Sequence, residues 1–175
     1  VYNHELEEMR TIVRAAQEAG ISAIIASDMA VIAFANSIGM EIHISTQCSI
    51  SNTEAVRYYA QFADVMVTAR ELPLAQVAEI TQFILDNDIR GPKGDLVQIE
   101  LFGHGALCMS VSGKCYLSLD NYNHSANRGA CLQLCLRQYL VKDVESDTEL
   151  VVDGQYIMSP KDLCTIGFLD KIVKA

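Results

Sequence analysis

The sequence lacks several features that would place it in a membrane, in a secretory pathway or on a nucleic acid. No apolar run approaches the roughly 18 residues that a membrane-spanning helix needs, and nothing at its start resembles a signal peptide. Basic residues are scarce, with 13 Lys and Arg against 22 Asp and Glu, and the net charge is -9. Because a phosphate backbone is bound mainly through Lys and Arg, any basic surface for a nucleic acid is expected outside these 175 residues. These absences predict a cytoplasmic protein without a membrane partner.

Short motifs of hydrolases and of structural zinc sites are also missing. The sequence holds no Gly-x-Ser-x-Gly elbow and no His-Glu-x-x-His helix, and its cysteines form no tight Cys-x2-Cys knuckle. What it does contain is 50% apolar and 20% charged residues, which is enough for one globular core. Because the first residue is Val1 rather than Met, we expect a piece of a longer protein.

Helix and strand patterns alternate along the first 102 residues. Apolar residues recur at helical spacing over 5–19, 30–38, 53–62 and 73–85, and strand-like runs cover 22–26, 41–46, 64–69 and 96–102. This alternation predicts an α/β fold with a parallel sheet covered by helices. The repeat length suits a TIM-type (β/α) barrel, but four repeats cannot close one, since such barrels usually need about 250 residues. We therefore predict a partial barrel, with an open three-layer sheet as the competing architecture.

The rest of the chain breaks this pattern. Residues 1–175 are interpreted as a fragment of one barrel catalytic domain, with β/α repeats over 1–102, a Cys-rich insertion over 103–147, and a hairpin and helix over 148–175. The hairpin is expected to turn at Asp153 and Gly154, and the helix to start near Ser159 and Pro160. The insertion follows the carboxyl end of a strand, where barrels carry their active sites. The open sheet edges predict that the fragment self-associates.

Four cysteines in the insertion form the pattern Cys-x6-Cys-x15-Cys-x3-Cys. They are Cys108, Cys115, Cys131 and Cys135. Without a secretory signal the thiols are expected to be reduced, and four thiolates suit a soft metal or an iron–sulfur cluster. The long spacings favour a 4Fe-4S cluster wrapped by a loop, with zinc as the alternative. Cys48 and Cys164 are expected to be inert buried side chains.

Alternation along the strand that precedes the insertion predicts a polar face. In the stretch 96–104, Gln98, Glu100 and His104 share one face, and aliphatic residues share the other. In a barrel the aliphatic face would contact the helices, so the polar side chains would point inward.

The same alternation groups polar residues on the two preceding strands. It places His43, Ser45 and Gln47 on one face, and Met66, Thr68 and Arg70 on another. If these faces meet in one interior, an ion pair of Arg70 with Glu100 would orient a substrate. The alternative is a satisfied hydrogen-bond network without chemistry.

A longer pattern around these residues resembles the signature of a known family. It reads Glu100-x-Phe102-x2-Gly105-Ala106-Leu107-Cys108-x4-Gly113-x-Cys115-x-Leu117-Ser118, and further matches lie at Ser45-Thr46-Gln47, Asn52, Arg70-Glu71-Leu72, Asn127-Arg128-Gly129-x-Cys131-x3-Cys135 and Ser159-x-Lys161-Asp162-Leu163. The family is the collagenase-like peptidase family numbered U-thirty-two, and the resemblance covers nearly the whole chain.

The resemblance implies a barrel-like catalytic domain and several possible activities. Members are named as proteases, whereas other relatives are iron–sulfur proteins that hydroxylate uridine in tRNA, cytidine in ribosomal RNA or a quinone precursor without oxygen. Prephenate is implied as the hydroxyl donor of the RNA branch. The implied substrate-binding residues are His43, Ser45, Gln47, Asn52, Glu71, Asn127 and Arg128, beside the catalytic candidates Glu100, His104 and Arg70.

Three functions follow as hypotheses. The first is an iron–sulfur enzyme for oxygen-independent hydroxylation of RNA or a related small-molecule substrate, bound mostly through regions outside these residues. The second is a peptidase that cleaves collagen-like or other peptides. The third is a non-catalytic binding domain in which a structural metal ion cross-links the cysteines.

Overall fold

The computed structural model describes residues 1–146, 148–152 and 158–175, and these residues form two compact units. The first, here called the sheet unit, comprises residues 1–101 and 168–175. The second, here called the cysteine unit, comprises residues 102–167. Each unit has its own strands and helices and is described by itself.

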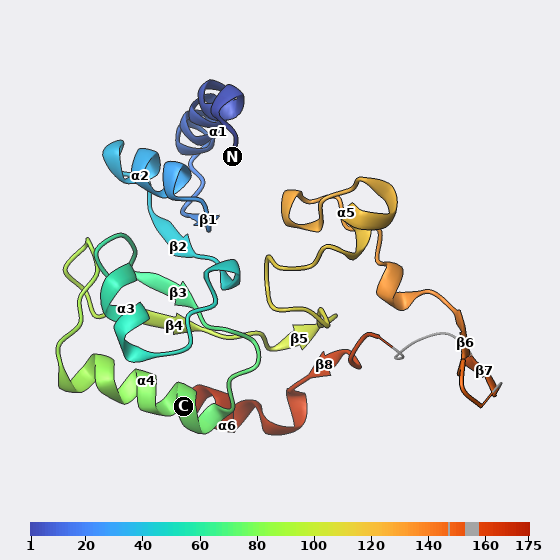
Figure 1. Cartoon of the computed structure of the whole chain (residues 1–175). Coiled ribbons are helices and arrows are strands. Elements are labelled where there is room, and N and C mark those ends of the chain that lie inside the picture. The colour runs from blue at the N-terminus through green and yellow to red at the C-terminus, as the bar shows by residue number, and fades with distance from the viewer. Residues whose placement is uncertain (147, 153–157) are drawn as a thin grey trace. The chain divides into compact units, whose positions relative to one another are not determined.

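The sheet unit consists of parallel strands that alternate with helices (Figure 1). Its elements in chain order are α1 (Leu6–Glu18), β1 (Ile24–Ala26), α2 (Met29–Ser37), β2 (Ile42–Ile44), α3 (Thr53–Tyr59), β3 (Val65–Val67), α4 (Leu74–Asp86), β4 (Gln98–Glu100) and, at the end of the chain, α6 (Leu169–Lys174). The strands are parallel and stand in the order β1-β2-β3-β4. The predicted α/β class with a parallel sheet is therefore confirmed.

Local signals in the sequence fix where these helices begin and end. The side chain of Asp28 caps α2 by accepting a hydrogen bond from the Ala30 amide, and Asn52 caps α3 in the same way through Ala55. Gly39 follows α2 with a φ of 73°, a conformation that glycine adopts without strain. Because these residues set where each helix begins and ends, the loops between helix and strand are short.

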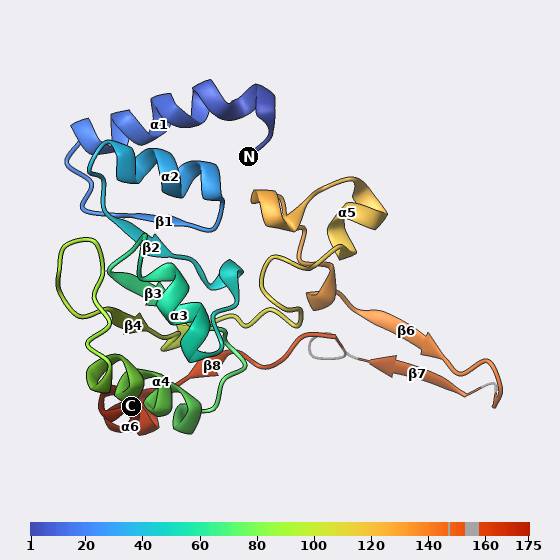
Figure 2. The same cartoon turned by 60° about the vertical axis from the view of Figure 1, so that its left-hand side comes forward.

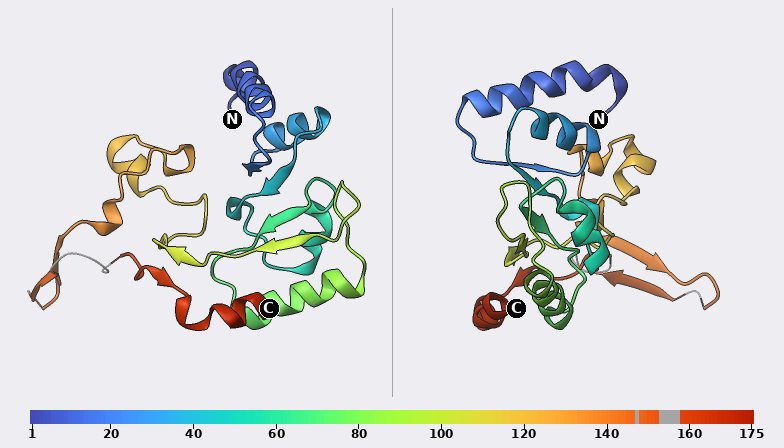
Figure 3. Two further views of the ribbon diagram at one scale, coloured as in Figure 1. Left: turned by 180° about the vertical axis from the view of Figure 1, so that it is seen from behind. Right: turned by 90° about the vertical axis from the view of Figure 1, so that its left-hand side faces the viewer.

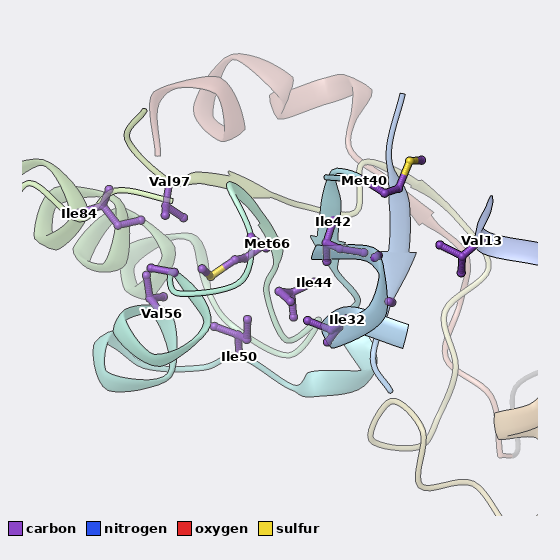
Figure 4. Close-up of a cluster of buried hydrophobic side chains, with 14 of the residues drawn as sticks. Val13, Ile32, Met40, Ile42, Ile44, Ile50, Val56, Met66, Ile84 and Val97 are labelled. Atoms are coloured by element: carbon purple, nitrogen blue, oxygen red, sulfur yellow. The ribbon is translucent and has the colours of Figure 1, made fainter. Parts of the chain in front are cut away.

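One face of the sheet is buried against the helices. Ile42, Ile44 and Met66 are at most 1% exposed, and they pack with Ile32 of α2 and Val56 of α3 (Figure 4). Burial of a side chain of this size stabilises a fold by roughly 1.5–3 kcal/mol. The helix-facing side of the sheet is thus the main hydrophobic core of the sheet unit.

The other face of the sheet carries the polar candidates, with one correction. The register aligns His43 with Val65 and Gln98, whereas Met66 aligns with Ile44 on the helix side. The expectation that Met66 and Thr68 belong to the polar face is therefore wrong. All three residues of β3 are apolar, so alternation alone could not tell which face is buried.

The cysteine unit contains short elements joined by loops. These are β5 (His104–Gly105), α5 (Leu117–Tyr122), β6 (Tyr139–Lys142), β7 (Glu149–Val152) and β8 (Leu163–Cys164), with 3-10 helices at Ala126–Arg128 and Leu134–Leu136. Strand β5 pairs with β8, and β6 pairs with β7; both pairs are antiparallel. Figure 2 shows β6 and β7 as an extended two-stranded ribbon.

Two predictions concern the last 28 residues, a hairpin and a long helix, and the described residues test the second. Strand β7 pairs with β6, which precedes it, and the loop between them starts at Asp143, whose carboxylate accepts hydrogen bonds from the Glu145 and Ser146 amides. The expected turn at Asp153 and Gly154 lies outside the described residues. The expected long helix is wrong, because residues 163–164 form β8, a 3-10 helix follows at Ile166–Phe168, and α6 begins at Leu169. Pairing with β5, some 60 residues earlier, outweighs the local helix signal.

Helix α6 packs against α4 within the sheet unit (Figures 1 and 3). Among the described residues, no helix combines the length and the apolar character that crossing a membrane would take.

Candidate functional site

His43 lies between two carboxylates on the polar face of the sheet. Its Nδ1 is 3.7 Å from Oε2 of Glu100, and its Nε2 is 3.7 Å from Oε1 of Glu41. His43 comes from β2 and Glu100 from β4, so the pair spans the intervening strand β3. The imidazole is 24% exposed, which leaves it accessible on the open side. Histidine is the side chain that most often acts as a general acid or base in enzymes, which makes this group a candidate site.

Glu41 is the member of this group that sequence reasoning missed. Nζ of Lys93 donates a hydrogen bond to its carboxylate, which lowers the pKa of Glu41; partial burial opposes that shift, and the nearby charge of His43 adds to it. Glu41 therefore stays ionised beside the imidazole. A signal was available, because Glu41 and His43 are two residues apart and share one face of the strand. Lys93 was not predictable, since it is 52 residues away.

The loop that carries Lys93 is held against Asp64. The backbone amide of Lys93 donates to Oδ1 of Asp64 at 3.0 Å. A Cβ atom on Gly91 would lie 2.3 Å from the same oxygen and 2.8 Å from the Asp64 Cα. Only glycine fits this close approach, so Gly91 helps to set the position of Lys93.

Three of the predicted substrate-binding residues make local hydrogen bonds at the carboxyl ends of β1 and β2. Ser45 accepts a hydrogen bond from the Gln47 amide, and Oε1 of Gln47 accepts one from the Ser27 hydroxyl at 2.8 Å. Asn52 is the cap of α3. These contacts hold the loops after two neighbouring strands together. A role in substrate binding stays a prediction for all three.

Arg70 and Glu71 follow β3 in the loop that leads to α4. The strand ends in a bridge between Thr68 and Ile50, and the Thr68 hydroxyl is buried without a hydrogen-bond partner in the described part of the chain. Glu100 has a partner in His43, and the expected ion pair of Arg70 with Glu100 stays a prediction. The catalytic role of Arg70 stays a prediction.

A pocket of about 570 Å³ opens beside the outer edge of β4. Its walls include apolar side chains of α4, β4 and α6, among them Val77, Ile99 and Val173. Glu100 and Gln98 add polar groups to this lining. Glu100 therefore borders both the His43 group and this pocket.

The four cysteines of the predicted metal set lie within the cysteine unit, and none of them forms a disulfide in the described part of the chain. Burial raises the pKa of the Cys135 thiol, and the negative charges of Cys108, Cys131 and Cys115 raise it further. Mutual repulsion of this kind requires the thiols to be neighbours. The structure thus brings together four side chains that span 28 positions of the sequence.

Backbone contacts shape the loop around Cys131. The Gln133 amide donates to the Cys131 sulfur at 3.4 Å, with Gln133 in the left-handed conformation at φ 51°. The Leu132 amide donates to the hydroxyl of Ser118, which is 2% exposed. Amide hydrogen bonds to cysteine sulfur tune iron–sulfur sites. Ser118 is part of the family pattern, and the structure shows that its hydroxyl bonds to the Leu132 amide.

The thiols are neighbours without forming the ligand shell of one ion. Within residues 1–146, 148–152 and 158–175, no three His, Cys, Asp or Glu side chains are placed to hold a metal ion. Four cysteine thiols in one unit are a donor set that suits either a soft single ion or a four-iron cluster, and the choice between them stays a prediction.

The remaining predicted residues of the cysteine unit are exposed. Asn127 and Arg128 lie in a 3-10 helix that ends at Gly129, just before Cys131. His104 lies in β5 and is opposed by Cys164 of β8. Since Glu100 and His104 belong to different units, their expected meeting on one face stays a prediction.

The two other cysteines differ from the buried type expected. Cys164 is exposed on β8, where pairing with β5 replaces the predicted helix. Cys48 is half-buried, and its thiol lies 3.8 Å from the Ser27 carbonyl oxygen. Burial raises the pKa of the Cys48 thiol, and a hydrogen bond with Tyr59 partly offsets this rise. Burial also raises the pKa of Tyr59, to about 12.

Comparison with known proteins identifies the class to which this fold and cysteine pattern belong. The model of peptidase family U32 matches residues 1–175, and the chain belongs to this family. A relative named collagenase from Porphyromonas gingivalis strain W83 is 58% identical over 175 residues, which is all of this chain and 42% of the relative.

Other relatives are named for RNA hydroxylation. The tRNA hydroxylation protein P1 of Bacillus subtilis is 29% identical over 99% of this chain and 40% of its own length. The 23S rRNA 5-hydroxycytidine C2501 synthase of Escherichia coli is 32% identical over 93% of this chain and 23% of its own length. The chain thus spans less than half the length of these curated relatives. No solved structure matches.

Proposed function

We propose that this chain is part of an iron–sulfur enzyme that hydroxylates RNA, or a related small molecule, without oxygen. The observation that carries the proposal is the gathering of four reduced thiols in one unit, with three of them raising the pKa of the fourth. The names of two relatives support an RNA substrate. A cytoplasmic location goes with this proposal, because reduced thiols persist there.

The proposed architecture is a TIM-type barrel completed by further chain. Consecutive parallel strands in the order β1-β2-β3-β4, with helices on one face, are what such a barrel requires. Strand β4 lies at the edge of the sheet, where a further strand would pair. The 175-residue piece alone would then self-associate through this edge, and light scattering that returned a clean monomer would contradict this.

In this proposal the residues of the two units have different tasks. Cys108, Cys115, Cys131 and Cys135 would hold the cluster, which would supply electron transfer when bound. His43 would hold or move a proton at Nδ1, beside Glu100, while Glu41 fixes its other nitrogen. Prephenate is the candidate hydroxyl donor.

Anaerobic purification of the full-length protein tests the cluster directly. Iron and sulfide near four per chain, with a broad visible absorption and an EPR signal after reduction, are expected. Cys135→Ser should abolish all three signals, whereas Cys164→Ser, outside the four-cysteine set, should leave them unchanged. A colourless protein with stoichiometric zinc would overturn the proposal and favour a non-catalytic binding domain whose cysteines are cross-linked by zinc.

A peptidase is the second candidate, and one observation besides the collagenase name favours it. The register of β5 and β8 sets His104 opposite the exposed Cys164, and a thiol beside an imidazole can act as a nucleophile. Peptide cleavage by the pure full-length protein should then be lost in both Cys164→Ser and His104→Gln. Activity that persists in these variants would point to a contaminating protease.

A further inference from the structure

The cysteine unit reverses the charge of the chain in one segment. Residues 102–142 contain four basic side chains, Lys114, Arg128, Arg137 and Lys142, and one carboxylate, Asp120, so this segment carries +3 in a chain of -9. Lys142 is paired with Glu149 of the acidic segment that follows. The expectation that any basic surface lies outside this chain stays a prediction, and this segment offers an alternative to it. A local positive charge of this kind attracts a phosphate backbone even when the whole chain is acidic.

In the same segment, the guanidinium of one side chain lies over an exposed aromatic ring. The ring of Tyr122, at the end of α5, is 50% exposed, and the Arg137 guanidinium carbon is 5.3 Å from the ring centre. Nη1 of Arg137 also donates to the Tyr122 hydroxyl at 3.1 Å. The two side chains are 15 residues apart in the sequence and lie together as one ring–guanidinium pair.

The backbone beneath this surface is held in place. The Leu132 amide bonds to Ser118 of α5, and the Tyr139 hydroxyl donates to the Leu134 carbonyl oxygen. These bonds tie α5, which carries Tyr122, to the segment that leads into Arg137. A stacking surface needs such support, because a mobile ring loses more entropy when a ligand orders it.

A second stack in the molecule shows why this one is suited to a ligand. Arg57 lies over Phe83 in the sheet unit at the same distance, 5.3 Å. Phe83, however, is half-buried and lies in α4, in a unit rich in carboxylates. Tyr122 combines greater exposure with a locally basic segment, which the Arg57 stack lacks.

We propose that Tyr122 and Arg137 form a stacking platform for an unpaired base of a single-stranded RNA segment, with Lys114 and Arg128 close in sequence to contact phosphates. The proposal rests on the RNA substrate of the proposed function and adds where this chain would bind it. Unpaired bases stack on aromatic rings and on guanidinium planes, and such contacts tolerate different bases. Sequence preference would then come from other parts of the protein.

Binding of a fluorescent single-stranded RNA of mixed sequence to the anaerobic full-length protein tests the platform. Tyr122→Leu removes the ring and should weaken binding about tenfold. Tyr122→Phe keeps the ring and should stay within about twofold of the wild type. Arg137→Gln should weaken binding and reduce the slope of log affinity against log salt by about 0.7. The matched control Arg57→Gln should leave affinity and slope unchanged.

Cluster absorbance, recorded on the same samples, separates this inference from the proposed function. RNA binding that depends on Tyr122 in a protein without a cluster would support the platform and overturn the iron–sulfur proposal. Equal affinities for the wild type and Tyr122→Leu, or an equal loss in Arg57→Gln, would overturn the platform. So would displacement of the RNA by an acidic peptide at lower concentration than by unlabelled RNA, because the surface would then be a peptide site.

Discussion

The sheet unit and the cysteine unit are built on different physical principles. In the sheet unit, helices bury a continuous apolar face that includes Ile32, Ile44, Val56 and Met66. Of the side chains described between residues 102 and 167, Leu134 is the one apolar side chain that is buried. A fold with so little apolar burial depends on other cross-links. The contrast indicates that the sheet unit is a scaffold stabilised by its core, whereas under the proposed function the cysteine unit would be stabilised by the cluster that its thiols would hold.

The largest expected effect comes from removing the proposed cluster. In small metal-bound folds the binding free energy, roughly 10–16 kcal/mol for structural zinc, is also folding free energy. Chelation, or Cys135→Ser, should therefore unfold the cysteine unit and leave the sheet unit folded. Hydrogen exchange of the full-length protein should show loss of protection over residues 108–136 and unchanged protection over 42–44. Equal loss in both units would contradict the division, and Cys164→Ser is the control.

The second effect tests the core of the sheet unit. Ile44 is 0% exposed, and Ile44→Ala should lower the free energy of unfolding by about 2–5 kcal/mol, because it removes buried methyl groups and leaves a cavity. Ile25 lies on the neighbouring strand β1 with 62% exposure, and Ile25→Ala should cost less than about 0.5 kcal/mol. Urea denaturation followed by circular dichroism measures both. Similar losses would mean that the second face is also covered in the full-length protein.

The third effect compares two glycines, one from each unit. Gly91→Ala would place a Cβ atom 2.3 Å from the Asp64 Oδ1, and the loop with Lys93 would have to shift, at a cost of about 1–3 kcal/mol. Gly167 has open space around the same position, so Gly167→Ala should leave stability unchanged. Thermal melts of the two variants provide the test. A neutral Gly91→Ala would show that the loop adapts and that Lys93 is not held by it.

The contrast between the units also explains how much the sequence could predict. The helices and strands of the sheet unit were predictable because apolar spacing and caps such as Asn52 and Gly39 act locally. The face of β3 was not, since Val65 and Met66 are equally apolar and only the register with β2 separates them. The helix expected near Ser159 failed for a similar reason, because its residues pair with a distant strand.

The residues of the candidate site also fall into those that the sequence could predict and those that it could not. The four-cysteine set was recognised by spacing, because loop-borne ligands leave a pattern in the sequence. His43 and Glu100 were predicted for one face by alternation, and the structure brings their side chains to 3.7 Å. Lys93 could not be predicted, since a contact over 52 residues depends on the finished sheet.

The smallest expected effect is a pH dependence that differs between the units. In the sheet unit, the Lys93 hydrogen bond lowers the pKa of Glu41 below its usual value of 4.5. A lowered folded-state pKa gives stability that is present above pH 4.5 and is lost as the pH falls through the folded value. Glu41→Gln should therefore be less stable than the wild type at pH 6, by a fraction of the Ile44→Ala effect, and equal to it near pH 3.

Asp143 provides the matched test in the cysteine unit. Backbone hydrogen bonds from Ser146 and Glu145 lower its pKa as well, so Asp143→Asn should also lose stability above the usual carboxyl range. Because Asp143 lies in the loop between β6 and β7, that loss should be confined to hydrogen exchange of residues 139–149, whereas Glu41→Gln should affect residues 42–44. If Glu41→Gln showed no loss at pH 6, the Lys93 pair would contribute nothing to the scaffold, and Glu41 would serve only to position His43.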